Sequence, residues 1–213
     1  MSPSFVRDQI DKLPLVAILR GLTPAEAIEI GTALYEAGIT VMEVPLNSPV
    51  EPLESIRLLS EHFSGKAAVG AGTVLTPKDA ERVHAAGGQL IVSPNTNPEV
   101  IKRTKELGLH SLPGVATCSE CFQAIEAGAD GLKIFPASTL GPKGVKDLTA
   151  VIPQDVDLFA VGGVNDQNMG EWMTIRIKGV GLGSNLYSPG DSPEEVAKKT
   201  HLMLNAFRNA TGG

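Results

Sequence analysis

The chain has 213 residues, with 18 basic and 24 acidic side chains and a formal net charge of -6 at pH 7. This length allows one substantial hydrophobic core, and no Pro/Gly/Ser-rich linker divides it, so we expect a single domain over residues 1–213. The acidic balance lacks the basic stripe of nucleic-acid binders, and no apolar run approaches the roughly 18 residues of a membrane span. We therefore expect a cytoplasmic protein that binds neither nucleic acid nor membrane.

The cysteines and histidines give little basis for a disulfide framework or a metal site. Cys118 and Cys121 have the C-x-x-C spacing of a redox pair, but they open a predicted helix, and no second pair is present to complete a zinc site. The four histidines are scattered, without a pair at i and i+4. We expect no metal, and redox chemistry at the two cysteines is the less favoured interpretation.

Apolar segments alternate with amphipathic stretches along the whole chain. A short helix is expected at about residues 4–12, and strands near 15–20, 40–46, 67–73, 90–94, 110–115, 131–136, 157–163 and 179–184. A hydroxyl or amide residue followed by proline recurs after several strands, which is typical of helix starts. These pairs are Thr23-Pro24, Ser48-Pro49, Thr76-Pro77, Asn97-Pro98 and Ser192-Pro193.

The strict alternation of strand and helix predicts parallel strands joined by right-handed crossovers. Eight such units in one chain of this length favour an α/β fold of the (β/α)8 TIM-barrel type with a short N-terminal helix. A Rossmann-like open sheet is the second choice. It is weakened because no G-x-G-x-x-G motif opens the first helix.

One lysine lies inside an apolar strand, in the run Leu132-Lys133-Ile134-Phe135-Pro136. Removal from water disfavours the ammonium form, so burial lowers the pKa of such a lysine and supplies a free amine near neutral pH. A free amine is the group that forms a Schiff base with a carbonyl substrate. The alternative is a lysine on an edge or on a solvated strand face.

In a barrel, reactive side chains are expected where strands end, and phosphate at the loops after the seventh and eighth strands. The strand ends carry Arg20, Glu43, Thr73 and Pro94 besides Lys133. Glycine pairs follow both late strands, at Gly162-Gly163 and around Gly183-Ser184, where backbone N–H groups can approach an anion. Tight turns are the alternative interpretation of either pair taken alone.

Glu43 lies between Met42 and Val44 on a predicted strand, where a carboxylate is costly to bury without a partner or a proton. A buried carboxylate beside an amine is typical of a proton shuttle, which makes Glu43 the candidate general acid/base. A structural role as the partner of a buried arginine such as Arg20 is the alternative. Thr73 and Arg20 have structural alternatives too. The hydroxyl of Thr73 could bond the backbone of a strand, and Arg20 could form a salt bridge across the barrel mouth.

These segments together resemble the class I aldolases that cleave 2-keto-3-deoxy-6-phospho sugar acids. The resemblance runs over essentially the whole chain. It is carried by Ile18-Leu19-Arg20-Gly21, Glu43-Val44-Pro45-Leu46-Asn47-Ser48-Pro49, Gly70-Ala71-Gly72-Thr73-Val74-Leu75, Pro113-Gly114-Val115-Ala116-Thr117, Leu132-Lys133-Ile134-Phe135-Pro136 and Val161-Gly162-Gly163-Val164. One departure is the run Thr174-Ile175-Arg176-Ile177-Lys178, which leaves the end of the seventh helix undetermined.

The resemblance implies a carbon–carbon lyase that releases pyruvate and glyceraldehyde 3-phosphate, works as a homotrimer and uses no metal or organic cofactor. It assigns the Schiff base to Lys133, acid/base work to Glu43, and the keto-acid carboxylate to Arg20 and Thr73. The other implied contacts with the phosphorylated keto-deoxy sugar acid are Pro94, Phe135, Val161, Gly162, Gly163, Gly183 and Ser184.

Two branches of this family differ in the C4 configuration of their substrate. Asn47 and Val161 stand where the gluconate branch carries an arginine and a threonine. The chain therefore resembles the galactonate branch, which implies a role in galactonate degradation. The gluconate epimer is the first alternative. A phosphosugar isomerase or epimerase, or a non-catalytic phosphometabolite sensor, could share the glycine loops but would have no use for Lys133.

Overall fold

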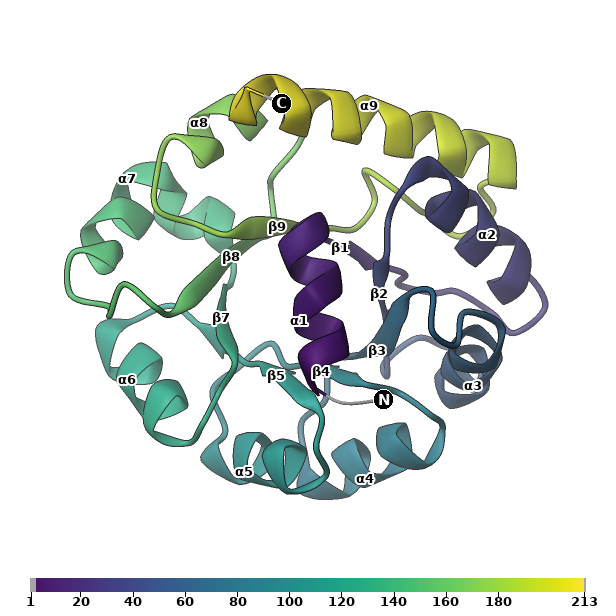
Figure 1. The fold of residues 1–213 in the computed structure, drawn as a ribbon, viewed down its shortest axis with the longest axis horizontal. Helices are drawn as coiled ribbons and strands as arrows, with labels where there is room; N and C mark the ends of the chain where they lie inside the picture. The colour runs from purple at the N-terminus through teal and green to yellow at the C-terminus, as the bar shows by residue number, and fades with distance from the viewer. Residues whose placement is uncertain (1–2, 213) are drawn as a thin grey trace.

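A computed structural model describes residues 3–212, and in it nine parallel strands form one sheet in the order β5-β4-β3-β2-β1-β9-β8-β7-β6. Figure 1 shows the strands as a ring with helices around it. The fold prediction is therefore confirmed. The strands are β1 (Leu15–Ile18), β2 (Val41–Pro45), β3 (Ala68–Gly72), β4 (Leu90–Val92), β5 (His110–Leu112), β6 (Gly114–Val115), β7 (Gly131–Ile134), β8 (Asp157–Val161) and β9 (Gly179–Leu182).

The ring closes at Pro113, which lies between β5 and β6. The predicted fifth strand, 110–115, was expected to be continuous and is instead divided there. Proline has no backbone N–H to donate to a ladder, but its carbonyl still accepts from Lys133 N at 2.9 Å. Asp130 N likewise donates to Ser111 O at 3.0 Å. Together β5 and β6 thus take the place of one strand between β4 and β7.

The helices within the described residues lie between successive strands and outside the ring (Figure 1), except for the first. They are α1 (Pro3–Lys12), α2 (Ala27–Ala37), α3 (Pro52–His62), α4 (Pro77–Ala85), α5 (Pro98–Glu106), α6 (Cys118–Glu126), α7 (Ala137–Thr149), α8 (Met169–Met173) and α9 (Pro193–Thr211). Three predicted helix starts are confirmed, because Thr76, Asn97 and Ser192 each cap the following helix with a side-chain oxygen.

Two predicted helix starts are wrong. Thr23 does bond Glu26 through its N–H and its hydroxyl, but residues 24–26 form a turn and α2 begins only at Ala27. The hydroxyl oxygen of Ser48 accepts from Gly21 N at 2.9 Å, so this side chain ties two loops together instead of capping. Helix α3 therefore starts at Pro52, after Glu51 in a left-handed conformation.

The two faces of the sheet bury different sets of apolar side chains. The outer face packs on the helices, while the inner face fills the barrel with residues such as Val16, Leu90 and Phe159. Val6 and Ile10 of α1 belong to this inner cluster, and Figure 1 shows α1 lying across the middle of the ring. Helix α1 thus closes the end where the strands begin, which leaves the other end for a site.

The run 174–178, which left the end of the helix after the seventh predicted strand undetermined, has a structural role. Helix α8 ends at Met173, and Arg176 then donates hydrogen bonds to the carbonyls of Thr149, Ile152 and Pro153 behind α7. In the described part of the chain, no helix is both long and apolar enough to cross a membrane.

Candidate active site

A cavity of about 350 Å³ opens at the carboxyl ends of the strands. It is lined by all eleven residues predicted to contact substrate or perform chemistry, which come from seven strands and the loops that follow them. Those residues are Arg20, Glu43, Thr73, Pro94, Lys133, Phe135, Val161, Gly162, Gly163, Gly183 and Ser184. The structure brings the predicted set to one place, whereas the roles given to its members stay predictions.

Lys133 lies on β7 with its side chain pointing into the barrel mouth. It is 7% exposed, and its Nζ lies 4.5 Å from the centre of the Phe135 ring. Burial lowers the pKa of the amine, which Glu43 partly offsets by attraction, while the charge of Arg20 lowers it further. The interpretation of Lys133 as a solvated strand residue is therefore wrong, and its lowered pKa favours the neutral amine relative to an exposed lysine.

Glu43 lies on β2 and is 2% exposed. Burial raises its pKa to about 7, against the opposing attraction of Lys133 and Arg20 and a hydrogen bond with the Gly72 backbone. Its Oε2 atom has no hydrogen-bond partner among the described residues. A carboxyl group that titrates near neutral pH and keeps one oxygen unpaired is suited to moving protons for a bound molecule.

The space that Glu43 occupies depends on the absence of a side chain at position 72. A Cβ atom on Gly72 would lie only 2.1 Å from Oε2 of Glu43, far inside van der Waals contact. Glycine on the neighbouring strand β3 is therefore what allows a carboxylate to be folded into the mouth of the barrel.

Arg20 follows β1, and its side chain is exposed, so the alternative of a buried arginine paired with Glu43 is wrong. Its Nη1 donates instead to Oδ1 of Asn47 at 2.7 Å. Thr73 follows β3 with a φ of 56°, a left-handed conformation that β-branched residues rarely adopt. Such strain is concentrated at functional sites, where the surrounding structure holds it in place.

The two glycine loops present backbone donors to the cavity. Gly162 and Gly163 have φ values of 97° and 84°, which only glycine adopts without strain. Among the hydrogen bonds of residues 3–212, none uses the backbone N–H of Gly163, Val164, Ser184 or Asn185. All four residues line the cavity. Clustered unpaired N–H groups of this kind form an anion-binding concavity.

Sequence reasoning missed five further residues of the lining: Ile18, Val164, Asn165, Gly181 and Asn185. Gly181 provides room, since a Cβ there would lie 2.8 Å from a methyl group of Val161. A signal for the two asparagines was present, because Asn165 and Asn185 each follow a glycine pair within two positions. Polar side chains placed so close to a predicted phosphate loop could have been flagged as candidates.

The cysteines lie elsewhere, at the start of α6. Cys118 is exposed and Cys121 is buried, and burial raises the pKa of the Cys121 thiol to about 11. A thiol with so high a pKa is protonated at neutral pH and is a poor nucleophile. Across residues 3–212, no three His, Cys, Asp or Glu side chains come together as a possible metal site.

Comparison with known proteins identifies the family of the chain. A family model described as KDPG and KHG aldolase matches residues 6–199. The 2-dehydro-3-deoxy-6-phosphogalactonate aldolase of Escherichia coli is 46% identical over 93% of this chain and 97% of its own length. A probable enzyme of the same name from Rhizobium meliloti is also 46% identical, over 94% of each chain. The KHG/KDPG aldolase of Escherichia coli is 29% identical over 92% of each chain.

Solved structures agree with these sequence relatives. One described as the native KDPGal structure has a TM-score of 0.92 at 46% identity, and the match covers 95% of this chain and 98% of that one. The 2-keto-3-deoxy-6-phosphogluconate aldolase of Zymomonas mobilis has a TM-score of 0.82 at 25% identity, covering 93% and 95%. Given the matching family model, the two relatives at 46% identity and a barrel with a buried lysine at its mouth, this chain belongs to the KDPG and KHG aldolase family, whose members are carbon–carbon lyases.

Proposed function

We propose that this enzyme cleaves 2-dehydro-3-deoxy-6-phospho-D-galactonate to pyruvate and D-glyceraldehyde 3-phosphate through a Schiff base on Lys133. The observation that carries the proposal is the desolvated amine of Lys133 in one cavity with the buried carboxyl group of Glu43. The names of the two relatives at 46% identity support the choice of substrate.

The chemistry follows from the two shifted pKa values, lowered for the Lys133 amine and raised to about 7 for Glu43. Lys133 attacks the C2 carbonyl as a neutral amine, and Glu43 moves the protons that convert the carbinolamine into an iminium ion and water. Glu43 then takes the C4 hydroxyl proton as the C3–C4 bond breaks, and the electron pair moves into the iminium to form an enamine. Glyceraldehyde 3-phosphate leaves. Protonation of the enamine at C3 and hydrolysis by water release pyruvate and restore the amine.

Binding groups at the two ends of the substrate orient the reacting carbons. Arg20 and Thr73 are assigned to the carboxylate beside C2, and Pro94 and Phe135 to the walls of the cavity. The unpaired N–H groups around Gly163 and Ser184 are assigned to the 6-phosphate. Binding energy from the phosphate, which does not react, can then be used to hold the C3–C4 bond parallel to the π orbitals of the iminium ion, as formation of the enamine requires.

Borohydride reduction in the presence of pyruvate, followed by mass spectrometry, tests the assignment of Lys133. We expect a stable adduct on Lys133 and none in the Lys133→Ala variant. An isomerase, an epimerase or a phosphometabolite sensor would give no adduct. Absence of the adduct at millimolar pyruvate would contradict the Schiff-base mechanism.

The C4 epimer is assigned through Val161, which lines the cavity without a hydrogen-bonding group. A site that does hydrogen-bond a substrate hydroxyl can reject its epimer strongly. We expect the galactonate epimer to be cleaved with the higher kcat/KM, and Val161→Thr to shift the ratio toward the gluconate epimer by about 1 to 3 kcal/mol. Coupled assays with both epimers measure this, and a wild type that prefers the gluconate epimer contradicts the assignment.

Assembly, cofactor and cellular place remain part of the proposal. We propose a homotrimer of single-domain chains in the cytoplasm, acting without a metal or organic cofactor. Sedimentation analysis should give three times the mass of one chain. Chelation with EDTA should leave activity unchanged, whereas inhibition that added metal restores would favour a metal-dependent aldolase.

A further inference from the structure

Three consecutive carbonyl groups after β8 each accept a hydrogen bond, one from α7, one from within the same loop and one from the loop after β9. Gly162 O accepts from Ser138 N at 3.0 Å, and Gly163 O accepts from the Asn168 side-chain amide at 2.8 Å. Val164 O accepts from the Asn185 side-chain amide at 2.5 Å. These bonds account for the carbonyls of both glycines and of the residue that follows them.

The bonded carbonyls determine where the neighbouring N–H groups point. A peptide unit is planar, and its C=O and N–H are directed to opposite sides. A donor fixed on Gly163 O therefore fixes the N–H of Val164 in the opposite direction, and a donor on Gly162 O does the same for Gly163. Both N–H groups lack an acceptor within residues 3–212, and both residues line the cavity.

Asn168 is itself held in place by its neighbours. Its Oδ1 accepts from Asn165 N at 2.8 Å, while Asn165 Oδ1 accepts from Gln167 N and Asn168 N at 2.9 and 3.0 Å. Asn165 and Asn168 thus form a small network of hydrogen bonds within the loop itself. The side chain that bonds Gly163 O therefore has little freedom to turn away.

Asn185 does a different job, because it belongs to the loop after β9 and bonds the loop after β8. Its own backbone N–H and that of Ser184 have no acceptor among residues 3–212, and both residues line the cavity. One side-chain amide therefore fixes the spacing between two sets of donors that come from different strands.

We infer that Asn168 and Asn185 are positioning residues that turn the two glycine loops into one rigid cradle for the substrate phosphate. Asn168 sets the direction of the donors in the first loop, and Asn185 sets the distance between the loops. The inference rests on the proposed function and adds to it the source of the cradle's rigidity. The side-chain amides of both residues bond loop carbonyls and not Lys133 or Glu43, so both should act on phosphate binding and leave Schiff-base chemistry alone.

The test uses inorganic phosphate and pyruvate as separate probes on the full-length enzyme. We expect Asn185→Ala and Asn168→Ala each to raise the Kd for phosphate, measured by calorimetry, about five- to twentyfold, the effect of losing roughly one charge-assisted contact. Asn185→Asp keeps the shape but loses the donor and adds a negative charge, so its loss should be larger. Trapping of pyruvate on Lys133 should change less than twofold in all three variants, and KM for the phosphorylated substrate should rise more than kcat falls.

Asn97→Ala is the matched control, because Asn97 caps α5 and bonds a backbone carbonyl outside the cavity. It should lower the melting temperature as much as the other two substitutions without changing phosphate affinity. Unchanged phosphate affinity in the Asn185→Asp variant, or equal losses for phosphate and pyruvate, would overturn the inference. Failure of the proposed function would look different, because the wild type itself would then trap no pyruvate.

Discussion

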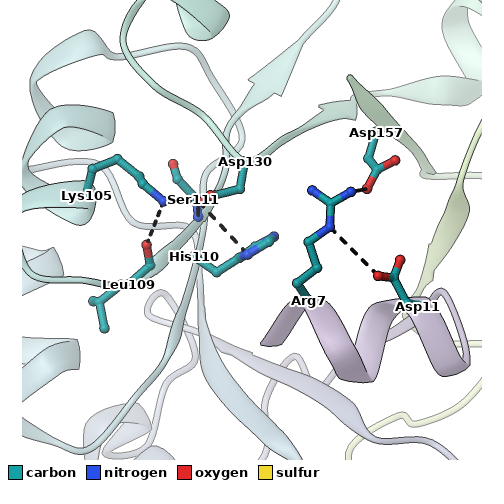
Figure 2. A network of polar contacts seen from close by, with 8 residues as sticks. All are labelled: Arg7, Asp11, Lys105, Leu109, His110, Ser111, Asp130 and Asp157. Carbon is teal, nitrogen blue, oxygen red and sulfur yellow. Dashed lines mark hydrogen bonds and ion pairs between the residues drawn. The ribbon is translucent and has the colours of Figure 1, made fainter. Parts of the chain in front are cut away.

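The two ends of the barrel differ in how far their charged side chains are paired. At the carboxyl ends of the strands, Glu43 is buried with one oxygen unpaired and Lys133 is buried without a full counter-charge. At the amino ends, below α1, Lys105 donates to both oxygens of Asp130, which also accepts from Ser111 N (Figure 2). The contrast is confined to charged groups: those at the cavity lack a full partner, whereas the acidic and basic side chains named at the closed end are paired with each other.

The closed end is also where α1 is attached. Figure 2 shows Arg7 between Asp11 on the same helix and Asp157 at the start of β8, at 3.8 and 3.5 Å. Lys178 reaches Asp11 from the residue before β9. Partly exposed pairs of this kind each contribute little, but together they fix the helix over the apolar interior. The comparison predicts that changes at the open end affect rate and changes at the closed end affect stability.

The largest expected effect is at Lys133. Lys133→Ala should reduce kcat/KM at least about 1000-fold, because it removes the nucleophile, while the folded protein loses a buried amine that was costly to desolvate. Lys133→Arg should be equally inactive, since a guanidinium stays protonated at any working pH. A coupled assay and a thermal melt measure the two effects. Substantial activity in either variant would place the nucleophile elsewhere.

Glu43→Gln should come next, with kcat lower by about 100- to 10,000-fold, the usual contribution of a positioned acid/base. The amide has the same shape, so folding should persist. The wild-type pH–rate profile should show an ionisation near pH 7 that the variant lacks, because the pKa of Glu43 is raised to about 7. A profile that keeps this ionisation in the variant would assign it to another group.

The two ends should also give opposite dependences of stability on pH. Burial lowers the pKa of His110, which faces Asp130, Lys105, Arg7 and Asp157, from 6.5 to about 4. Between these values the unfolded chain binds more protons, so the free energy of unfolding falls as pH drops from 6.5 toward 4. Glu43 acts in reverse, because its folded pKa is above the unfolded value of 4.5.

When either His110 or Glu43 is replaced, the dependence of the unfolding free energy on pH should therefore be dominated by the group that remains. Between pH 8 and pH 5, His110→Asn should lose about 2 kcal/mol less stability than the wild type, from 1.36 kcal/mol for each pH unit below 6.5. Glu43→Gln should lose more than the wild type over the same interval. Urea unfolding at the two pH values measures both, and parallel curves for all three proteins would contradict the opposition.

Asp130→Asn should have the smallest effect of these changes, a loss of about 1 to 2 kcal/mol of unfolding free energy, because Lys105 loses its ion-pair partner in a partly buried setting and keeps at most a hydrogen bond to the amide oxygen. Its kcat/KM should stay within twofold of the wild type. Asp11→Asn, which removes a more exposed partner of Lys178, is the control and should cost less. A loss of activity at Asp130 without a loss of stability would break the division between the two ends.

Much of this molecule could be predicted because its signals are local. Helix caps at Thr76, Asn97 and Ser192 need only the next few residues. The apolar neighbours of Lys133 made a buried amine one of two interpretations, and the structure shows it buried. The wrong helix start at Ser48 has a distant cause. Its hydroxyl binds Gly21 from another loop, and no local pattern records that choice.

The unpredicted parts of the site have the same origin. The Arg20–Asn47 bond joins positions 27 residues apart, and Asn185 bonds Val164 from 21 residues away. Such polar side chains could form hydrogen bonds with many different groups, and which bond forms depends on the loops that the folded barrel brings together. The division of the fifth strand at Pro113 was foreseeable in principle, since proline cannot donate to the ladder.

The pair Gly72 and Glu43 restricts the order in which descendants of this protein could change. With Glu43 present, any side chain at position 72 collides with the carboxylate, so a lineage that keeps the enzyme keeps the glycine. Only after position 43 has become small does alanine at 72 become harmless. That second step then hinders the return of glutamate. A descendant can therefore lose the proposed acid/base residue by one substitution, but once position 72 has also changed it can regain glutamate only after glycine has returned there.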